Sequence, residues 1–541
     1  MTPVEQLRVA LDAATGALAG DGAPRATLER PKQAGHGDYA TNAALVLAPV
    51  VRRSPRDVAQ DLQGELEGRL GAVLERAEVA GPGFLNLFLA DAWHVDAVDW
   101  MLEAGERFGA GAPDRPERVN VEFVSANPTG PLTAASGRHA AYGDALARLL
   151  AFAGHEVSRE YYFNDAGSQV LRLGASIRAR ARGEQPPEDG YPGDYVRELA
   201  EQIPDAAEAS PEVLGHEGAR LLMEGIRGTL EAYRVHFDTW FLEASLHEGD
   251  PDAVARVLSR LEEQGHVYRS DGALWLRTTA FGDDKDRVVE RSSGELTYFA
   301  RDIAYHAHKL ERGFDRLINV LGSDHHGYIA RMKAVLAALG ADPDRLEVQM
   351  LQFVHIVESG ARTSMSKRRG DFVTLDELIG EIGVDATRFY MLSSSHDSTV
   401  DLDLELARRQ SAENPVYYVQ YAHARIGSVL RKAGEERVAA ALGAGADLGG
   451  IELHDSERRL VKRLLDFPDE AAEATARRAP HRITAYALDL AQAFTAFYRD
   501  CLVVGAEPTA LETFRLRLSV ASQRTIAQSL DLLGVSAPEE M

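Results

Sequence analysis

Hydrophobic and polar positions change their spacing along the chain and predict three structural units. Between residues 111 and 402, short apolar runs at 119–124, 157–162, 317–321 and 348–354 alternate with helical patterns such as 140–152. Alternation of strands and helices is typical of a parallel sheet with crossover helices. We therefore expect an α/β catalytic domain of the Rossmann type over 111–402.

The two flanking units differ from this pattern. Residues 1–110 open with a helical spacing of Val4, Leu7 and Leu11, which predicts a helix, followed by a second helix at 39–47 and a strand at 83–89. We expect a small α+β domain there. Residues 403–541 show helical periodicity with almost no strand signal, which predicts an all-α bundle with a loop at 439–450.

Composition narrows the class of protein. The chain has 541 residues, 45% hydrophobic and 26% charged, which fits a multidomain globular protein. No 18-residue apolar run predicts a membrane span, and the first residues do not resemble a signal peptide. The single cysteine, Cys501, excludes intrachain disulfides and suits a reducing cytoplasm. We expect a cytoplasmic protein.

The net charge of −24 would argue against a nucleic-acid partner if it were evenly spread. It is not, because residues 181–290 hold 24 acidic and 11 basic residues, a net of −13. Residues 405–541 carry only −2. We interpret 181–290, here called the acidic stretch, as an insertion in the catalytic domain, and the near-neutral C-terminal unit stays available for nucleic acid.

Two segments contain residues that could bind phosphate groups. In 125–139, Pro128, Gly130 and Pro131 prevent a helix until about Ser136, where a helix start would offer free N–H groups to phosphate. The second, 362–370, is a basic and hydroxyl-rich segment whose lysine, Lys367, could stabilise charge on a triphosphate. Each alone also fits an ordinary capped helix or a solvated surface.

Together these two segments resemble a class I aminoacyl-tRNA synthetase, and further matches narrow the resemblance to the arginyl-tRNA synthetase family over nearly the whole chain. The segments that carry the resemblance are 121–132, 161–167, 281–286, 298–306, 321–328 and 418–426.

The resemblance implies a site for arginine, whose planar guanidinium is best recognised by carboxylates. The positions that match the family's arginine pocket are Glu122, Asn127, Tyr298, Asp302 and His325. We expect Glu122 and Asp302 to supply charge and Asn127 to bind the amino-acid end.

It also implies an ATP site, with Lys367 stabilising the α-phosphate. The expected ATP-binding positions are Pro131, Thr133, Ser136, Gly137, Met365, Ser366 and Lys367. The family's His-x-Gly-His signature is replaced here by Thr-Ala-Ala-Ser at 133–136. Loss of one preorganised donor costs roughly 10²–10³ in rate, so we expect the Thr133 and Ser136 hydroxyls to substitute as catalytic groups. His139, three residues beyond the signature, fits a helix-surface histidine better.

For tRNA, the family match assigns Phe84 and Asn86 to a D-loop base and Tyr418, Tyr421 and Met541 to the anticodon region. Stacking on an aromatic ring with an amide beside it is a sound way to read an unstacked base. Basic residues of the C-terminal unit are candidates for phosphate contacts, although a solvated helix face fits most of them equally well. They are Arg425, Arg431, Lys432, Arg458, Arg459, Lys462, Arg463, Arg477 and Arg478.

The expected activity is arginine–tRNA ligation from ATP with Mg²⁺, L-arginine and tRNA(Arg), by a monomer that does not use a membrane or a structural metal. His306, His308, His325 and His326 could suggest a metal cluster, but no cysteine accompanies them. Two alternatives stay open: a weak or inactive paralogue that binds tRNA, favoured by the signature replacement, and a nucleotidyltransferase acting on another small substrate.

Overall fold

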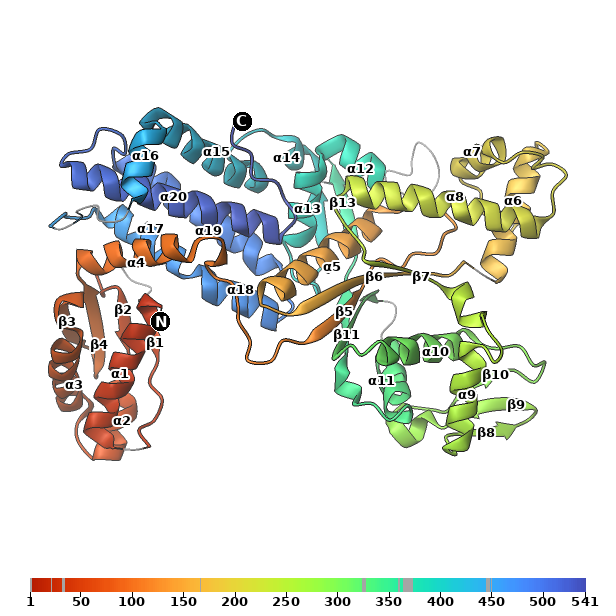
Figure 1. The fold of residues 1–541 in the computed structure, drawn as a ribbon, viewed down its shortest axis with the longest axis horizontal. Coiled ribbons are helices and arrows are strands. Elements are labelled where there is room, and N and C mark those ends of the chain that lie inside the picture. The colour runs from red at the N-terminus through yellow and green to blue at the C-terminus, as the bar shows by residue number, and fades with distance from the viewer. Residues whose placement is uncertain are drawn as a thin grey trace.

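The computed structural model describes residues 2–20, 22–31, 35–165, 167–323, 327–358, 361–362, 373–443, 448 and 450–541. Figure 1 shows the N-terminal domain at the left, the C-terminal helices along the top and two lobes at the right. The central sheet lies between the C-terminal helices and the lobes. None of the helices within these ranges is long and apolar enough to cross a membrane.

The central sheet has five parallel strands among the described residues, in the order β12-β11-β5-β6-β7. The strands are β5 (Arg118–Glu122), β6 (Glu156–Phe163), β7 (Thr239–Leu242), β11 (Arg316–Gly322) and β12 (Leu346–Leu351). This topology confirms the predicted Rossmann-type sheet. The predicted strand 348–354 is wrong at its end, because β12 stops at Leu351 and Val354 begins β13 of another sheet.

Helices cover both faces of this sheet, and the alternation of side chains along β11 shows the two cores. Ile318 and Val320 join the core that contains α5 (Ala134–Phe152), whereas Leu317 joins the core that contains α10 (Tyr298–Glu311) and α11 (Tyr328–Ala338). The sheet is therefore buried on both sides, as parallel sheets are.

The acidic stretch is not one insertion, because β7 lies inside it and forms an edge of the central sheet. It divides instead into two lobes, seen at the upper and lower right of Figure 1. The upper lobe, with its own core, contains α6 (Ser168–Ala181), α7 (Asp194–Gln202) and α8 (Pro211–Ala232). The lower lobe contains α9 (Ala253–Glu263) and the antiparallel strands β8 (Val267–Ser270), β9 (Ala273–Leu276) and β10 (Arg287–Glu290).

The N-terminal domain is α+β, as predicted. It contains α1 (Pro3–Ala19), β1 (Leu28–Glu29), β2 (Tyr39–Thr41), α2 (Ala43–Val51), α3 (Pro55–Leu70), β3 (Leu74–Ala80), β4 (Phe84–Leu89) and α4 (Asp91–Ala104). The predicted helix at 39–47 is wrong at its start, because Tyr39 and Thr41 are buried and pair with Leu87 and Leu85 of β4. The helix itself begins at Ala43.

The C-terminal residues form the predicted helical bundle, and no strand follows Asp403 within the described part of the chain. Its helices are α14 (Leu404–Arg408), α15 (Pro415–Ala433), α16 (Glu435–Leu442), α17 (Asp455–Leu465), α18 (Phe467–Ala476), α19 (His481–Asp500) and α20 (Thr509–Leu532). The predicted loop at 439–450 begins too early, because 439–442 belong to α16. Between sheet and bundle lie β13 (Val354–Glu358), β14 (Ala361–Arg362), α12 (Leu375–Ile382), α13 (Val384–Leu392) and β15 (Val400–Asp403).

Candidate active site

The order in which successive strands join the sheet reverses between β5 and β11. β6 and β7 lie on the β5 side of this point, and β12 lies on the β11 side. In open α/β sheets ligands bind in the crevice at the carboxyl ends of the two strands on either side of such a reversal. β5 ends at Glu122 and β11 at Gly322, so a ligand is expected at these two carboxyl ends, here called the crevice. The sequence-predicted segment 125–139 is one of its walls.

The turn directly after β5 is strained and firmly held. Val124 and Ser125 have φ values of 67° and 40°, in the left-handed region that a β-branched residue rarely adopts. The Tyr161 hydroxyl donates to the Ala126 carbonyl and accepts from the Ala126 N–H, both at 3.0 Å. Ser125 Oγ accepts from the Tyr162 N–H at 3.2 Å. These bonds fix the turn that leads to Asn127, whose side chain is exposed.

Glu122 is buried at the end of β5, and both its carboxylate oxygens are engaged. Oε2 accepts from the Lys309 ammonium at 2.6 Å, and Oε1 accepts from the Ser125 hydroxyl at 3.0 Å. The expected guanidinium partner is therefore already paired within the protein. Sequence reasoning missed this pairing, because Lys309 lies far along the chain on α10.

Asp302 lies on α10, one turn after Tyr298, and is half-buried. No side chain within the described ranges donates a hydrogen bond to its carboxylate. Loss of water contact, then repulsion from Glu122 and Glu243, raises the pKa of Asp302 to about 7. Tyr298 is 51% exposed at the mouth of this region. An incoming cation would relieve the repulsion that Asp302 experiences.

Glu243 is another residue that sequence reasoning missed. Its negative charge helps to raise the pKa of Asp302, and its own carboxylate is paired with Arg301. Its buried carboxylate accepts from the Tyr162 hydroxyl at 2.5 Å and from the Arg301 guanidinium at 3.0 Å. The resemblance at 161–167 pointed to Tyr162. Glu243 lies in the acidic stretch, where no motif pointed to it.

The N-terminus of α5 lies within the segment 125–139. Thr133, rather than Ser136, caps the helix, because its Oγ1 accepts from the Ser136 N–H at 3.3 Å and the helix begins at Ala134. The Oγ atoms of Thr133 and Ser136 also lie 3.3 Å apart. Both side chains are half-buried, so their hydroxyls keep access to the crevice. The predicted start near Ser136 is therefore late by two residues.

A second helix N-terminus meets α5 here. The backbone of Leu132 to Ala134 bonds to that of Val373 and Leu375, and Thr374 caps α12 opposite Thr133. Gly137 is required for this packing, since a Cβ there would lie 2.7 Å from Leu375 Cδ1. The half-buried Pro131 precedes the meeting point. The N-termini of α5 and α12 thus lie close together, with the N–H groups of Ala134 and Leu375 bonded across the junction and those of Ser136 and Glu377 bonded to the Thr133 and Thr374 caps.

Four of the predicted site residues lie outside the described residues. They are His325 of the arginine pocket and Met365, Ser366 and Lys367 of the ATP site. The described chain resumes at Val373, immediately before the α12 N-terminus beside Thr133.

The predicted D-loop residues line a pocket of the N-terminal domain. Phe84 and Asn86 are two apart on β4, and both border a hollow of about 500 Å³ together with Arg30, His36 and Asn42. Phe84 is 42% exposed, so its ring is not part of the core. An exposed ring beside a largely buried amide fits one unstacked base.

The predicted anticodon residues lie on α15 and at the chain end. Tyr421 is exposed and stacks on Tyr417, with ring centroids 6.0 Å apart, and Arg425 lies 4.6 Å from the Tyr421 centroid. Tyr418 is half-buried against the core instead. Sequence reasoning therefore missed Tyr417, although its spacing of four from Tyr421 signalled a shared helix face. Met541 is 51% exposed.

Most of the basic residues proposed for phosphate contacts have protein partners. Arg458 pairs with Asp91 at 2.7 Å and Lys462 with Asp38 at 2.6 Å, which joins the bundle to the N-terminal domain. The other paired ones are Arg431 with Glu540, Arg463 with Asp466, Arg477 with Glu473 and Arg478 with Glu347. Their charges therefore contribute to domain packing and to surface pairs.

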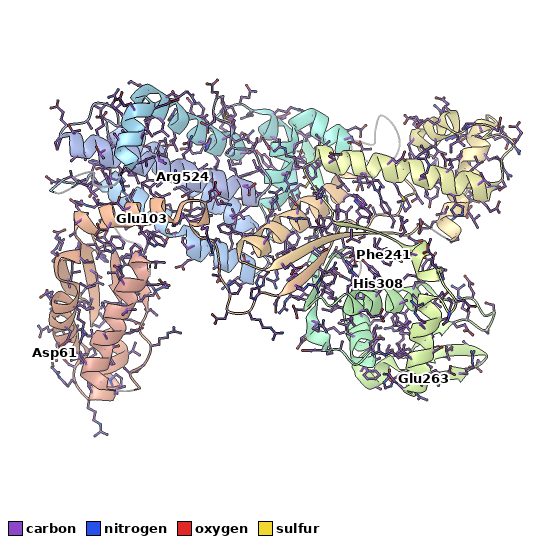
Figure 2. The ribbon with its side chains drawn as sticks, in the orientation of Figure 1. Asp61, Glu103, Phe241, Glu263, His308 and Arg524 are labelled. Atoms are coloured by element: carbon purple, nitrogen blue, oxygen red, sulfur yellow. The ribbon has the colours of Figure 1, made fainter. Side chains whose placement is uncertain are left out.

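Of the four histidines that could suggest a metal cluster, His306 and His308 lie on α10, and His325 and His326 lie outside the described residues. No group of three or more His, Cys, Asp or Glu residues in the described ranges could hold a metal ion. His306 is buried and its Nδ1 donates to the Asp302 carbonyl at 2.9 Å. Figure 2 shows the His308 ring of α10 beside Phe241 of β7, with centroids 5.2 Å apart.

A Rossmann-type sheet followed by a helical C-terminal bundle is the architecture of a class I aminoacyl-tRNA synthetase, and the family model that matches the catalytic domain shows this class. Family models agree along the chain: the arginyl tRNA synthetase N terminal domain matches residues 5–89, the class I (R) catalytic domain 220–426 and the DALR anticodon binding domain 419–541.

Whole-chain comparisons give the particular family. The arginine–tRNA ligase of Frankia alni is 46% identical, with complete coverage of both chains, and that of Geobacillus thermodenitrificans is 45% identical over 99% of this chain and 98% of its own. The Thermus thermophilus arginyl-tRNA synthetase structure superposes with a TM-score of 0.74 at 27% identity, covering 99% of this chain and all of its own. The chain belongs to the arginyl-tRNA synthetase family.

Proposed function

We propose that this chain ligates arginine to tRNA(Arg) in the crevice between β5 and β11. The arginine carboxylate attacks the α-phosphorus of ATP and releases pyrophosphate, and the terminal 2′-hydroxyl of tRNA then attacks the arginyl carbonyl and releases AMP. One observation carries the proposal: Asp302 forms no ion pair with a described residue, and its pKa is raised to about 7, in a chain that is 45% identical to an arginine–tRNA ligase over 99% of its length.

Asp302 pairs with the substrate guanidinium in this proposal. An ionised carboxylate and a guanidinium form charge-assisted hydrogen bonds that give both geometry and affinity. Tyr298, one turn earlier on α10, covers the side chain, while Asn127 binds the amino-acid end after the strained turn. Glu122 and His325 complete the pocket. Glu122 contributes through its fixed position, because Lys309 already neutralises its charge.

ATP binds against the N-terminus of α5. Pro131 and Gly137 border the phosphates, and the Thr133 and Ser136 hydroxyls donate to them in place of the family's two histidines. Met365, Ser366 and Lys367 bind the triphosphate, and Lys367 stabilises the charge that develops on the α-phosphate. Mg²⁺ enters with ATP, whose phosphate oxygens are its preferred ligands.

The tRNA spans three domains with proposed boundaries 1–110, 111–402 and 403–541. Phe84 and Asn86 hold a base of the elbow, and Tyr418, Tyr421 and Met541 contact the anticodon region, where Tyr417 extends the exposed stack. The acidic lobes lie on the side of the molecule away from the N-terminal domain (Figure 1), so their charge limits nonspecific binding. We place the protein in the cytoplasm as a monomer.

The test is arginine-dependent exchange of labelled pyrophosphate into ATP, with and without tRNA(Arg). Because activation in this family generally needs bound tRNA, we expect exchange only when tRNA is present. Absence of exchange with all substrates present would contradict adenylate formation.

A further inference from the structure

The carboxylates around the crevice follow a pairing scheme with one exception. Glu122 pairs with Lys309 at 2.6 Å, Glu243 with Arg301 at 3.0 Å and Glu160 with Arg312 at 2.6 Å. Asp302 has no such partner within the described residues. Among the described residues, Asp302 is thus the carboxylate of this group without an ion pair, although the Arg331 and Arg301 charges act on it from a distance, and a guanidinium could pair with it.

Lys309 is the most deeply buried cation in this scheme, since its side chain is 0% exposed. Besides Glu122, its ammonium donates to Asn319 Oδ1 at 3.3 Å, and it lies 4.4 Å from the centroid of the Tyr305 ring. It stands seven residues after Asp302 on α10, two turns along the same helix face. Helix α10 thus carries both Asp302, which has no ion pair with a described residue, and Lys309, which pairs with the neighbouring carboxylate of Glu122.

A neutral histidine fixes the orientation of this cation's second partner. His306 Nδ1 donates to the Asp302 carbonyl, so its Nε2 accepts from Asn319 Nδ2 at 3.1 Å. Burial lowers the pKa of His306 to about 3, which keeps the ring neutral. The amide oxygen of Asn319 must then face Lys309. Each donor of this buried network therefore has a defined acceptor.

We propose that Lys309 is a positioning residue for arginine binding, which holds the Glu122 carboxylate in place and cancels its charge, so that the substrate guanidinium pairs with Asp302, the carboxylate that forms no ion pair with a described residue. The inference rests on the arginine pocket of the proposed function. Without Lys309, two unpaired carboxylates would face each other in a desolvated site, where both cannot ionise together. Glu122 would then take up a proton or move, and the pocket would lose its geometry.

The test replaces Lys309 with methionine, which keeps the length of the side chain and removes its charge. We expect Lys309→Met to raise the arginine KM at least about tenfold while the KM values for ATP and tRNA stay within about twofold. A purely structural role would lower stability without this selective change. Lys333→Met removes a lysine that pairs with Asp344 at the surface and serves as the matched control, with an unchanged arginine KM.

A double variant keeps the proposal testable if Lys309→Met does not fold. Glu122→Gln with Lys309→Met removes both charges and preserves the shape of the pair, which proteins tolerate better than one unpaired buried charge. We expect adding Lys309→Met to Glu122→Gln to leave the arginine KM unchanged, because the charge that Lys309 balances is gone. A tenfold rise in that background, or an unchanged KM in Lys309→Met alone, would overturn the proposal.

Asp302→Asn separates this inference from the pocket assignment on which it rests. A raised arginine KM in Asp302→Asn together with an unchanged KM in Lys309→Met would leave the pocket in place and refute the role of Lys309. An unchanged KM in Asp302→Asn would refute the pocket itself.

Discussion

Thr133 Oγ1 accepts a hydrogen bond from the backbone N–H of Ser136 at 3.3 Å and so caps the helix whose N-terminus borders the crevice. The hydroxyl hydrogen of Thr133 is not consumed by this bond. The Thr133 and Ser136 hydroxyls also form a hydrogen bond with each other at 3.3 Å, which engages one of their two hydrogens and leaves the other for a phosphate.

If these hydroxyls bind the phosphates of ATP, their joint removal will slow adenylate formation. For Thr133→Ala with Ser136→Ala we expect a loss of roughly 10²-fold in the rate of arginine-dependent pyrophosphate exchange, with the arginine KM unchanged. Loss of the cap also destabilises the helix by about 1 kcal/mol. Ser210→Ala removes a similar cap, that of α8, and controls for this effect. Exchange at the unmodified rate would show that the hydroxyls are dispensable.

Asp302 makes arginine binding dependent on pH. Its carboxyl group has a pKa of about 7 in the unliganded protein and must be ionised to pair with a guanidinium. As pH falls below 7 the group takes up a proton, so the arginine KM should rise by up to about tenfold per pH unit at saturating ATP. Steady-state charging between pH 5.5 and 8.5 measures this.

The matched variant for the pH experiment is Asp302→Asn. It should bind arginine weakly at every pH, and its arginine KM should vary little below pH 7. A slope equal to that of the unmodified chain would mean that another group governs binding.

Phe84 offers an exposed ring to the elbow of tRNA. Because stacking of a base on an aromatic ring contributes about 1–3 kcal/mol, Phe84→Ala should raise the tRNA KM by roughly 5- to 150-fold. The ring is 42% exposed, so the variant should fold normally. Val9→Ala, which truncates an exposed apolar residue of α1 in the same domain, should have no effect on the tRNA KM.

A variant of Tyr421 tests the proposed contact with the anticodon region of the tRNA. Its exposed ring lies between Tyr417 and Arg425, so Tyr421→Ala should weaken tRNA binding by about tenfold and leave the arginine and ATP KM values unchanged. Tyr498→Ala removes the other ring near Arg425 and shows whether that ring also contributes to tRNA binding. Unchanged tRNA binding in Tyr421→Ala would exclude α15 from the interface.

The sequence predicted those parts of the fold whose pattern is local. β5 and β11 are apolar runs bounded by polar residues, and the sheet confirms both. Tyr39 and Thr41 fall in the segment predicted as a helix, but pairing with a strand more than forty residues away decides their structure. β7 escaped prediction because its four residues lie in a stretch interpreted by its charge.

The candidate site shows the same division. Family motifs pointed to Glu122, Asp302 and Thr133; the structure brings Glu122 close to Asp302 and places Thr133 at the N-cap of α5. Which carboxylate is free could not be read from the motifs, because the partners of Glu122 and Glu243 depend on tertiary contacts. Lys309 is 187 positions from Glu122, and Tyr195 of the upper lobe donates to the Thr129 carbonyl across 66 positions.

The most direct test of the account is charging of tRNA(Arg) with radiolabelled arginine by the unmodified chain, beside a variant that restores the family signature through Thr133→His, Ala135→Gly and Ser136→His. We expect the unmodified chain to form arginyl-tRNA in the presence of ATP. The contradictory result is an unmodified chain that binds tRNA but forms no arginyl-tRNA, while the restored variant does, which would make this chain a tRNA-binding relative without ligase activity.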